Sequence, residues 1–234
     1  MKIPGLCLVF TAVLLLAARG DLAIVQKVEG SGSLKQITIK LKGDKVRVEV
    51  TPQLATIIEN KTGDVITLMN QEKKFLRISA DMSKAIAEMA SKYAGKTKSA
   101  EETAKLTATG RKEMINGYEA EEYVRETPSF KATYWITSKY PDSAAILKQL
   151  QSIIPAAWND VAKGMFDYRD FPGLPLRTSV KTNGKEITST ITSIKQDLLS
   201  EEEFSIPKDF QETKVPHLRE PMAEKPSASV SPNP

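Results

Sequence analysis

The sequence is poor in the side chains that most enzymes use for nucleophilic and metal chemistry. It has one cysteine, Cys7, which lies in an apolar leader, and one histidine, His217, which lies in a proline-rich tail. A body without cysteine has no disulfides, thiol catalysis or cysteine–zinc sites. A body without histidine has no base for a Ser-His-Asp triad. We therefore expect a protein that is not an enzyme and that uses no cofactor or metal.

The sequence also lacks a strong charge of one sign and a second long apolar run. It has 33 lysines and arginines against 29 aspartates and glutamates, for a net charge of +4; without Lys2 and Arg19 of the leader, +4 becomes +2. Scattered charges of both signs are typical of an ordinary solvated surface, not of a nucleic-acid footprint. We expect no nucleic-acid partner, and no membrane span once the leader is removed.

Residues 1–20 are typical of a secretory signal peptide. Lys2 gives a basic start, and Leu6–Leu16 is apolar apart from Thr11. Mostly small residues follow at positions 17–20, which predicts cleavage before Asp21 and an exported protein, periplasmic or secreted. A retained anchor is the alternative, but the apolar run is shorter than the roughly 20 residues that span a bilayer. A lipoprotein signal is disfavoured because the cysteine stands at the beginning of this run.

Clean alternation marks two strands within residues 33–51. Ile37, Ile39 and Leu41 share one face, and so do Val46, Val48 and Val50. Period-two alternation is typical of half-buried strands, and Gly43-Asp44 between them suits a type II′ hairpin turn.

Further short strands joined by turn residues predict an antiparallel meander. They are expected at residues 22–29, 54–59, 65–69 and 75–78, around 114–115 and 123–124, at 133–137 and within 176–194. Asn116-Gly117 and Asn183-Gly184 are predicted hairpin turns.

Two segments have a helical period instead. In residues 81–94, Met82, Ile86 and Met89 belong to one apolar stripe, with Asp81 as a possible cap and Gly95 as a possible end. The stripe either packs on the sheet or presents a soft methionine surface to a ligand. The second helix follows Pro141-Asp142, and its apolar face holds Ile146, Leu147, Leu150, Ile153 and Ile154. Pro155 then interrupts it and could open a third, short helix.

The order of strands, helix, strands, helix and strands predicts an α+β fold. We expect one strongly curved, mainly antiparallel sheet whose concave face is covered by two or three helices. Residues 21–212 are predicted to form a single domain. The tail at 213–234 is rich in proline and serine, and we expect it to be disordered.

Three blocks of sequence resemble a bacterial family of exported proteins known as domain of unknown function 4412. They are GDKVRVEV with IIENKTGDVITLMNQEKKF, TGRKEMINGYEAEEYV with ATYWIT, and FPGLPLRTSV with NGKEITSTITSI and FSIPKDF. That family is similar in fold to the periplasmic lipoprotein carriers of the LolA and LolB type. The resemblance implies a LolA-like open half-barrel with an apolar concave face and a lid of helices. In the carriers, this cavity holds acyl chains.

Two hypotheses of function follow. The first is a non-enzymatic binder of a lipid or an acylated protein, with the apolar residues Met82, Ile86, Met89, Trp135, Leu147 and Leu150 lining the cavity and the arginines Arg47 and Arg77 holding a head group. The second is a structural or interaction module of the cell envelope with a filled core and no ligand. For Trp135 a core position, and for both arginines an exposed sheet surface, are the simpler alternatives. Asp167, Tyr168, Arg169 and Asp170 form the best candidate for a functional loop cluster.

Overall fold

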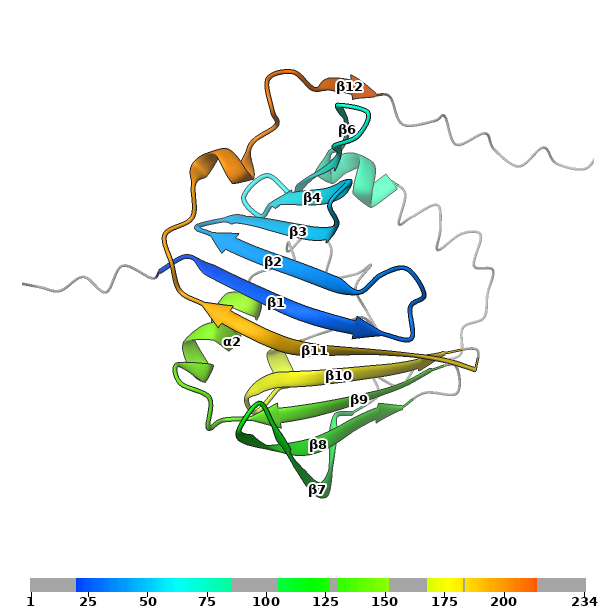
Figure 1. The fold of residues 1–234 in the computed structure, drawn as a ribbon, viewed down its shortest axis with the longest axis vertical. Coiled ribbons are helices and arrows are strands. Elements are labelled where there is room, and N and C mark those ends of the chain that lie inside the picture. Colours follow the sequence, from blue (N-terminus) through cyan, green and yellow to red (C-terminus); the bar gives the residue numbers. More distant parts are fainter. Residues whose placement is uncertain (1–19, 86–104, 127–129, 152–167, 183, 214–234) are drawn as a thin grey trace, which may run out of the picture.

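The computed structural model describes residues 20–85, 105–126, 130–151, 168–182 and 184–213. These residues form one open sheet of 12 strands, in the order β12-β6-β5-β4-β3-β2-β1-β11-β10-β9-β8-β7 (Figure 1). The strands are β1 (Leu22–Glu29), β2 (Gln36–Lys42), β3 (Lys45–Thr51), β4 (Leu54–Glu59), β5 (Asp64–Met69), β6 (Lys74–Ile78), β7 (Thr107–Ile115), β8 (Tyr118–Glu126), β9 (Phe130–Thr137), β10 (Leu174–Thr182), β11 (Lys185–Lys195) and β12 (Gln211–Thr213). Neighbours pair antiparallel except β12, which runs parallel to β6.

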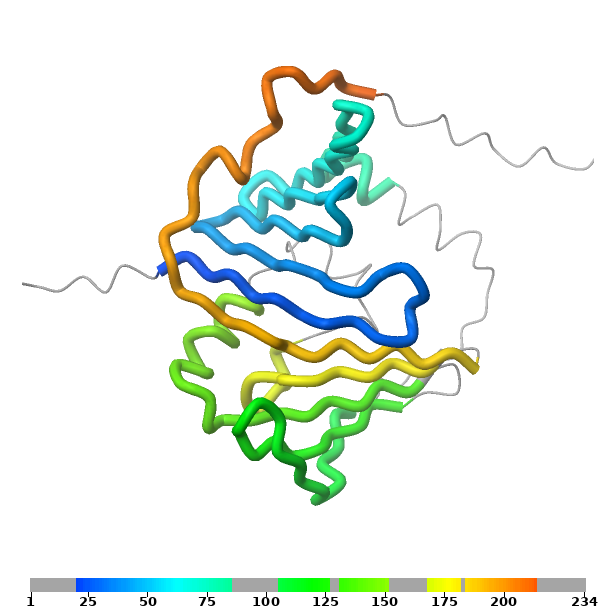
Figure 2. The backbone as a smooth tube through the Cα atoms, in the orientation of Figure 1, coloured from blue at the N-terminus to red at the C-terminus, as the bar shows by residue number. Residues whose placement is uncertain are grey.

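The predicted meander is confirmed, and its turns have the expected backbone. Gly43, between β2 and β3, has φ 59°. Asn116 and Gly117 both have positive φ, 52° and 83°, as a type I′ hairpin turn between β7 and β8 requires. The strands rotate steadily from one edge of the sheet to the other (Figure 2), which is the ordinary twist of L-residue strands.

Strand pairing gives the sheet two distinct faces, because paired side chains form rows across it. One row from β1 to β6 consists of Leu22, Leu41, Val46, Ile58, Val65 and Ile78. Leu22 and Leu41 share a core cluster with Ile146 and Leu150 of the helix α2 (Ser143–Gln151). We call this side the helix face.

The predicted second helix is confirmed as α2, although it begins at Ser143. Its described apolar residues Ile146, Leu147 and Leu150 are buried, while Ile153 and Ile154 lie outside the described residues, as does the predicted third helix. Within the described part of the chain, no helix has the length and apolar character needed to cross a membrane.

The predicted first helix begins earlier than expected. Residues 80–85 are helical, and the cap is Ser79 rather than Asp81: the N–H of Met82 donates to Ser79 Oγ at 3.2 Å. A serine hydroxyl just before the first turn satisfies a free backbone N–H, so the earlier residue takes the cap position. The predicted continuation to residue 94, with Ile86 and Met89, lies outside the described residues.

The opposite side of the sheet is closed by the C-terminal segment. We call residues 197–213 the C-terminal strap and the side it covers the strap face. The strap contains the 3-10 helix η3 (Glu201–Phe204) and β12. Ile206 and Phe210 pack against a cluster of buried residues on β4, β5 and β6. The sequence pattern did not predict β12, because Gln211, Glu212 and Thr213 have no apolar alternation.

Candidate functional site

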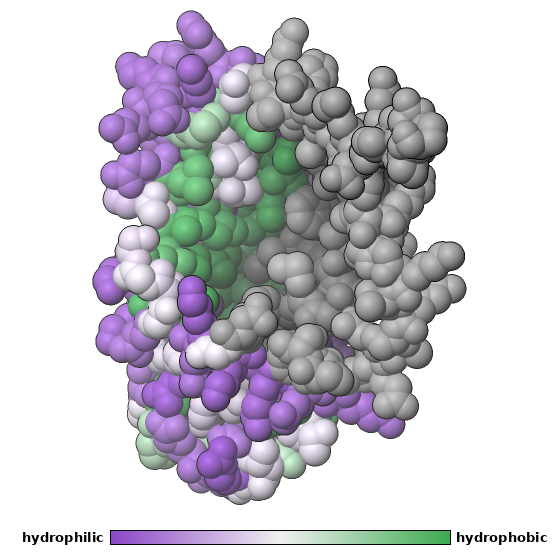
Figure 3. Space-filling view, turned by 90° about the vertical axis from the view of Figure 1, so that its right-hand side faces the viewer, coloured by the Kyte–Doolittle hydropathy of each residue, from purple (hydrophilic) through white to green (hydrophobic). Residues whose placement is uncertain are grey.

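The helix face of β1 to β6 is a continuous apolar surface. Beside the row that begins at Leu22 lies a second row of Ile24, Ile39, Val48, Thr56, Thr67 and Leu76. Neither row contains a charged residue. Figure 3 shows apolar side chains gathered in a hollow on this side of the molecule.

Burial on this face is uneven: Val65 of β5 is buried, and the second row is half-buried from Ile39 to Leu76. Leu22 and Ile24 of β1 are fully buried, whereas Ile78 and Leu76 of β6 are half-buried. At the end of β4, Leu54 is 37% exposed. A surface of this kind offers burial to an apolar chain and no group for chemistry on it.

Two predicted site residues, Leu147 and Leu150, lie together on α2 at the buried end of this face. Leu150 is in the cluster with Leu22 and Ile24. Leu147 packs with Tyr134 of β9 and with Phe171. Both leucines are therefore part of the interior that supports the face.

The two predicted arginines lie on the strap face instead. Arg47 is paired with Lys40 in register, between the inward-facing Val46 and Val48. Its Nε donates to Glu49 Oε1 at 2.7 Å, and its Nη1 donates to the carbonyl of Glu203 at 2.8 Å. Arg47 is thus engaged within the chain, away from the apolar rows.

Arg77 shares the strap face, because it is paired with Ile66 in the row that contains Ile57 and Arg47. Its Nη1 lies 3.3 Å from Asp64 Oδ2. Neither arginine is placed to hold the head group of a molecule lying on the helix face.

Trp135 and Met82 are not members of the apolar rows, although Trp135 packs against the core cluster that contains Leu22 and Ile24. Trp135 follows Tyr134 in β9, so the alternation of the strand points it to the face opposite Tyr134. The Cζ of Arg177 lies 5.4 Å from the centroid of the Trp135 ring, a cation–π contact. Met82 is 40% exposed in the first turns of its helix. A ligand-binding role for these two residues stays a prediction.

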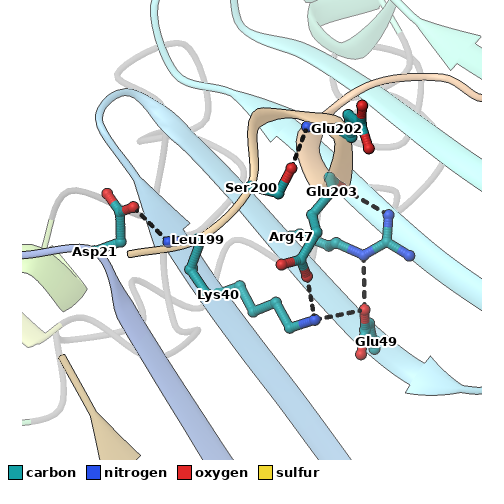
Figure 4. Close-up of polar contacts among 8 residues, drawn as sticks. All are labelled: Asp21, Lys40, Arg47, Glu49, Leu199, Ser200, Glu202 and Glu203. Atoms are coloured by element: carbon teal, nitrogen blue, oxygen red, sulfur yellow. Dashed lines mark hydrogen bonds and ion pairs between the residues drawn. The ribbon is translucent and has the colours of Figure 1, made fainter. Parts of the chain in front are cut away.

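An ionic cluster fastens the C-terminal strap to β2 and β3 (Figure 4). Lys40 bridges the carboxylates of Glu49 and Glu203, and Arg47 contacts the same two residues. Burial raises the pKa of the Glu49 carboxyl, but hydrogen bonds and charge from Arg47 and Lys40 outweigh it and leave the pKa below its ordinary value. Nearby, the N–H of Leu199 donates to Asp21 Oδ2 at 2.8 Å.

Beside this cluster lies a pocket of about 570 Å³. Arg47, Glu49 and Thr38 line it together with Lys35 and other residues of the β1–β2 and β3–β4 connections. Arg47 and Glu49 are paired with each other, so two of its charged groups are already engaged within the chain. Among the residues that the structure describes, no cluster of three or more His, Cys, Asp or Glu is suited to hold a metal ion.

The sequence analysis missed a buried arginine, Arg125, on the helix face of β8. It is paired with Ala132, which packs in the cluster of Tyr134, Leu147 and Phe171. Its Nη2 lies 3.4 Å from Asp170 Oδ2. The predicted loop cluster at 167–170 therefore supplies a partner to Arg125. The sequence signal was present in that loop, but nothing linked it to β8, 45 positions earlier.

One acidic residue of β8 is buried. Glu122 is 3% exposed. Its carboxylate is bound by the guanidinium of Arg111 on β7. An ion pair permits this burial because the charge remains compensated.

Residues 20–210 match the model of a domain of unknown function, DUF4412. The match covers most of the chain, which belongs to this family. No curated protein matches the sequence.

Solved structures give only distant likenesses. PNGF-II, in its C2 crystal form, has a TM-score of 0.41 and 17% sequence identity, and the match covers 85% of this chain and 31% of PNGF-II. The chain thus spans about a third of the length of PNGF-II. LprF from Mycobacterium bovis has a TM-score of 0.32 and 13% identity, with 82% and 90% of the two chains covered. At such low TM-scores and identities, neither likeness bears on function.

Proposed function

We propose that the chain is an exported, non-enzymatic protein that binds the apolar part of a lipid or of an acylated protein on the helix face. In this proposal the open sheet is a LolA-like half-barrel, and its hollow holds the ligand. The observation that carries the proposal is the pair of uncharged cross-strand rows on β1 to β6, of which the second is half-buried from Ile39 to Leu76. Burial of the ligand is the whole mechanism.

The energetics of such binding need no catalytic or metal group. Each methylene that leaves water contributes about 0.8 kcal/mol. The half-buried part of the second row, from Ile39 to Leu76, crosses five strands spaced about 4.8 Å apart, so a chain lying along it meets an aliphatic or threonine side chain at every step. Ten or so buried methylenes offset the lost freedom of the bound molecule.

Binding is tested directly with the protein recovered from a membrane-containing lysate. Native mass spectrometry before delipidation is expected to show a co-purifying lipid. After delipidation, the protein is expected to take up 1-hexadecanol and palmitate. Absence of both a co-purifying lipid and uptake would contradict the proposal, and would favour an envelope module with a filled core.

A variant on the face locates the binding. Leu54→Asp places a charge on the exposed edge of this face, two residues before Thr56 of the second row, and is expected to weaken 1-hexadecanol binding about tenfold or more. Leu198→Asp is the matched control, because Leu198 is 91% exposed on the strap and lies away from the helix face. Equal effects of the two substitutions would count against the helix face as the binding surface.

Export is the other part of the proposal. It is supported by the leader and by the role of Asp21, the first residue after the predicted cleavage site. The Asp21 carboxylate accepts hydrogen bonds from Lys42 and from the backbone of Leu199, each at 2.8 Å. The measured intact mass of the exported protein is expected to equal that of a chain beginning at Asp21. A mass that includes residues 1–20 would contradict cleavage.

A further inference from the structure

Arg125 is a buried cation with few partners among the residues that the structure describes. It is 7% exposed, and its only ion pair among the described residues is the 3.4 Å contact from Nη2 to Asp170. Its Nε is buried and has no hydrogen-bond partner. Asp170 itself is 68% exposed, so its carboxylate is largely hydrated and free to turn away.

Such an arrangement costs stability unless something else completes it. Buried charges are ordinarily paired and hydrogen-bonded, because removal from water is expensive. Arg111 in the neighbouring strand shows the ordinary solution on the other face, where two guanidinium nitrogens bind the Glu122 carboxylate. The guanidinium of Arg125 carries the same charge as that of Arg111 and is more buried. Among the described residues, it has no carboxylate partner besides Asp170.

The groups around Arg125 are suited to an oxyanion beside an apolar chain. The ring of Tyr134 lies 4.8 Å from that of Phe171, and the ring of Tyr168 lies 5.4 Å from it. Burial raises the pKa of Tyr134, an effect that the positive charge of Arg125 partly opposes. Burial and the neighbouring Tyr134 raise the pKa of Tyr168 to about 12. Both hydroxyls therefore stay protonated and able to donate; the charge of Arg125 acts on Tyr134, and Tyr134 acts on Tyr168.

We infer that Arg125, with the hydroxyls of Tyr134 and Tyr168, binds the oxyanion of an amphipathic ligand, a carboxylate or a phosphate attached to an apolar chain. This inference rests on the proposed function and adds the chemical class of the ligand. A planar guanidinium presents paired donors that match either oxyanion, and donation to an anion is stronger than donation to a neutral group.

The position of Arg125 suits this role because it shares the face of the apolar rows. Its neighbour two residues before, Tyr123, begins a row that continues through Tyr134 and Thr178 to Ser189 and Val28. Val28 is on β1, four residues beyond Ile24, where the second apolar row begins. Four strand steps of about 4.8 Å separate β8 from β1, and about 13 Å along β1 separate Val28 from Ile24, so a ligand bound at Arg125 directs its apolar tail across this face toward β1.

The test compares three ligands that share a 16-carbon chain: palmitate, hexadecyl phosphate and the neutral 1-hexadecanol. Their dissociation constants are measured at pH 7.5 on the delipidated wild-type protein, on Arg125→Met and on Arg77→Met. The last variant removes the same charge from the strap face and is the matched control. Wild type is expected to bind at least one anion about tenfold to a hundredfold more tightly than 1-hexadecanol. Arg125→Met is expected to lose this preference and keep 1-hexadecanol affinity, and Arg77→Met to keep both.

Each outcome has a distinct meaning. Preference for palmitate alone identifies a fatty-acid carboxylate as the ligand chemistry, and preference for hexadecyl phosphate alone identifies a phosphate head group. Equal binding of all three ligands to wild type overturns the oxyanion site and leaves the proposed function standing. No binding of any of the three overturns the proposed function, and this inference with it. A preference that survives in Arg125→Met, or disappears equally in Arg77→Met, overturns the role of Arg125.

Thermal stability separates binding from support of the fold. Since Arg125 is poorly compensated and Asp170 is hydrated, Arg125→Met is expected to have an unchanged or higher melting temperature without ligand. If Arg125 only supported the fold, Arg125→Met would lower the melting temperature and leave the anion preference intact. That combination would overturn the inference.

Discussion

The two faces of β2 to β6 differ in what closes them. On the strap face, the chain returns more than a hundred residues later to cover the sheet with Ile206 and Phe210 and to pair Glu203 with Lys40. On the helix face, the rows that end at Leu76 and Ile78 stay half-buried. The strap face is thus completed by charges and aromatic rings from the same chain, while the helix face is apolar and uncharged.

The difference shows that alternation alone does not determine the environment of a face. In β3, Val46 and Val48 are apolar, and Lys45, Arg47 and Glu49 are charged, which suggests a core side and a water side. Yet Arg47 is held beneath the strap, and its side chain is only 15% exposed. A polar face can be closed by a distant polar segment, and an apolar face can remain partly open.

The largest effect on this comparison is expected from the strap. Phe204 is 2% exposed in η3, which packs against β3. Phe204→Ala removes a fully buried ring and is expected to lower the free energy of unfolding by about 3–5 kcal/mol. The measurement is urea unfolding, with Leu198→Ala on the same strap, 91% exposed, as the control. A loss below about 1 kcal/mol would mean that the strap is dispensable, and would remove the contrast between the faces.

The strands and most turns of this sheet were predictable from local signals. Alternation located β2 and β3, and Asn116-Gly117 located the turn between β7 and β8, because hairpins are local in sequence. β12 was not predictable, since three polar residues become a strand only by pairing with β6 more than a hundred positions earlier. The cap at Ser79 was missed for a local reason. Ser79 and Asp81 both offer a side-chain oxygen near the start of the helix, and the backbone geometry selects Ser79.

The candidate site was predicted less well than the fold. Leu147 and Leu150 were correctly expected to be on an apolar helical face. The arginines were chosen by residue type, and pairing register places both Arg47 and Arg77 on the strap face. Arg125 was overlooked because its burial depends on Asp170, Tyr134 and the loop after α2, none of which is local to β8 in sequence.

A smaller effect is expected from the charges beneath the strap. Since the folded pKa of Glu49 is below its ordinary value, its contribution to stability is present above the unfolded pKa of about 4.3 and is lost as the pH falls through the lower folded value. Glu49→Gln is expected to reduce the loss of stability on acidification, by no more than about 1 kcal/mol for so partly exposed a pair. Urea unfolding of both proteins at pH 7 and pH 3 measures it, and parallel pH profiles would show that Arg47 and Lys40 do not stabilise the ionised carboxylate.

The smallest effect is expected on the open side. Leu54 is 37% exposed at the edge of the helix face, beside the second row, so Leu54→Ala removes a side chain that water already reaches. The free energy of unfolding is expected to change by about 0.5 kcal/mol or less, the usual range for surface substitutions. Urea unfolding without ligand measures this change. A loss of unfolding free energy comparable to that of Phe204→Ala would show that Leu54 is packed into a closed interior. The helix face would then be covered by the protein itself, as the strap face is, and would leave no space for a ligand.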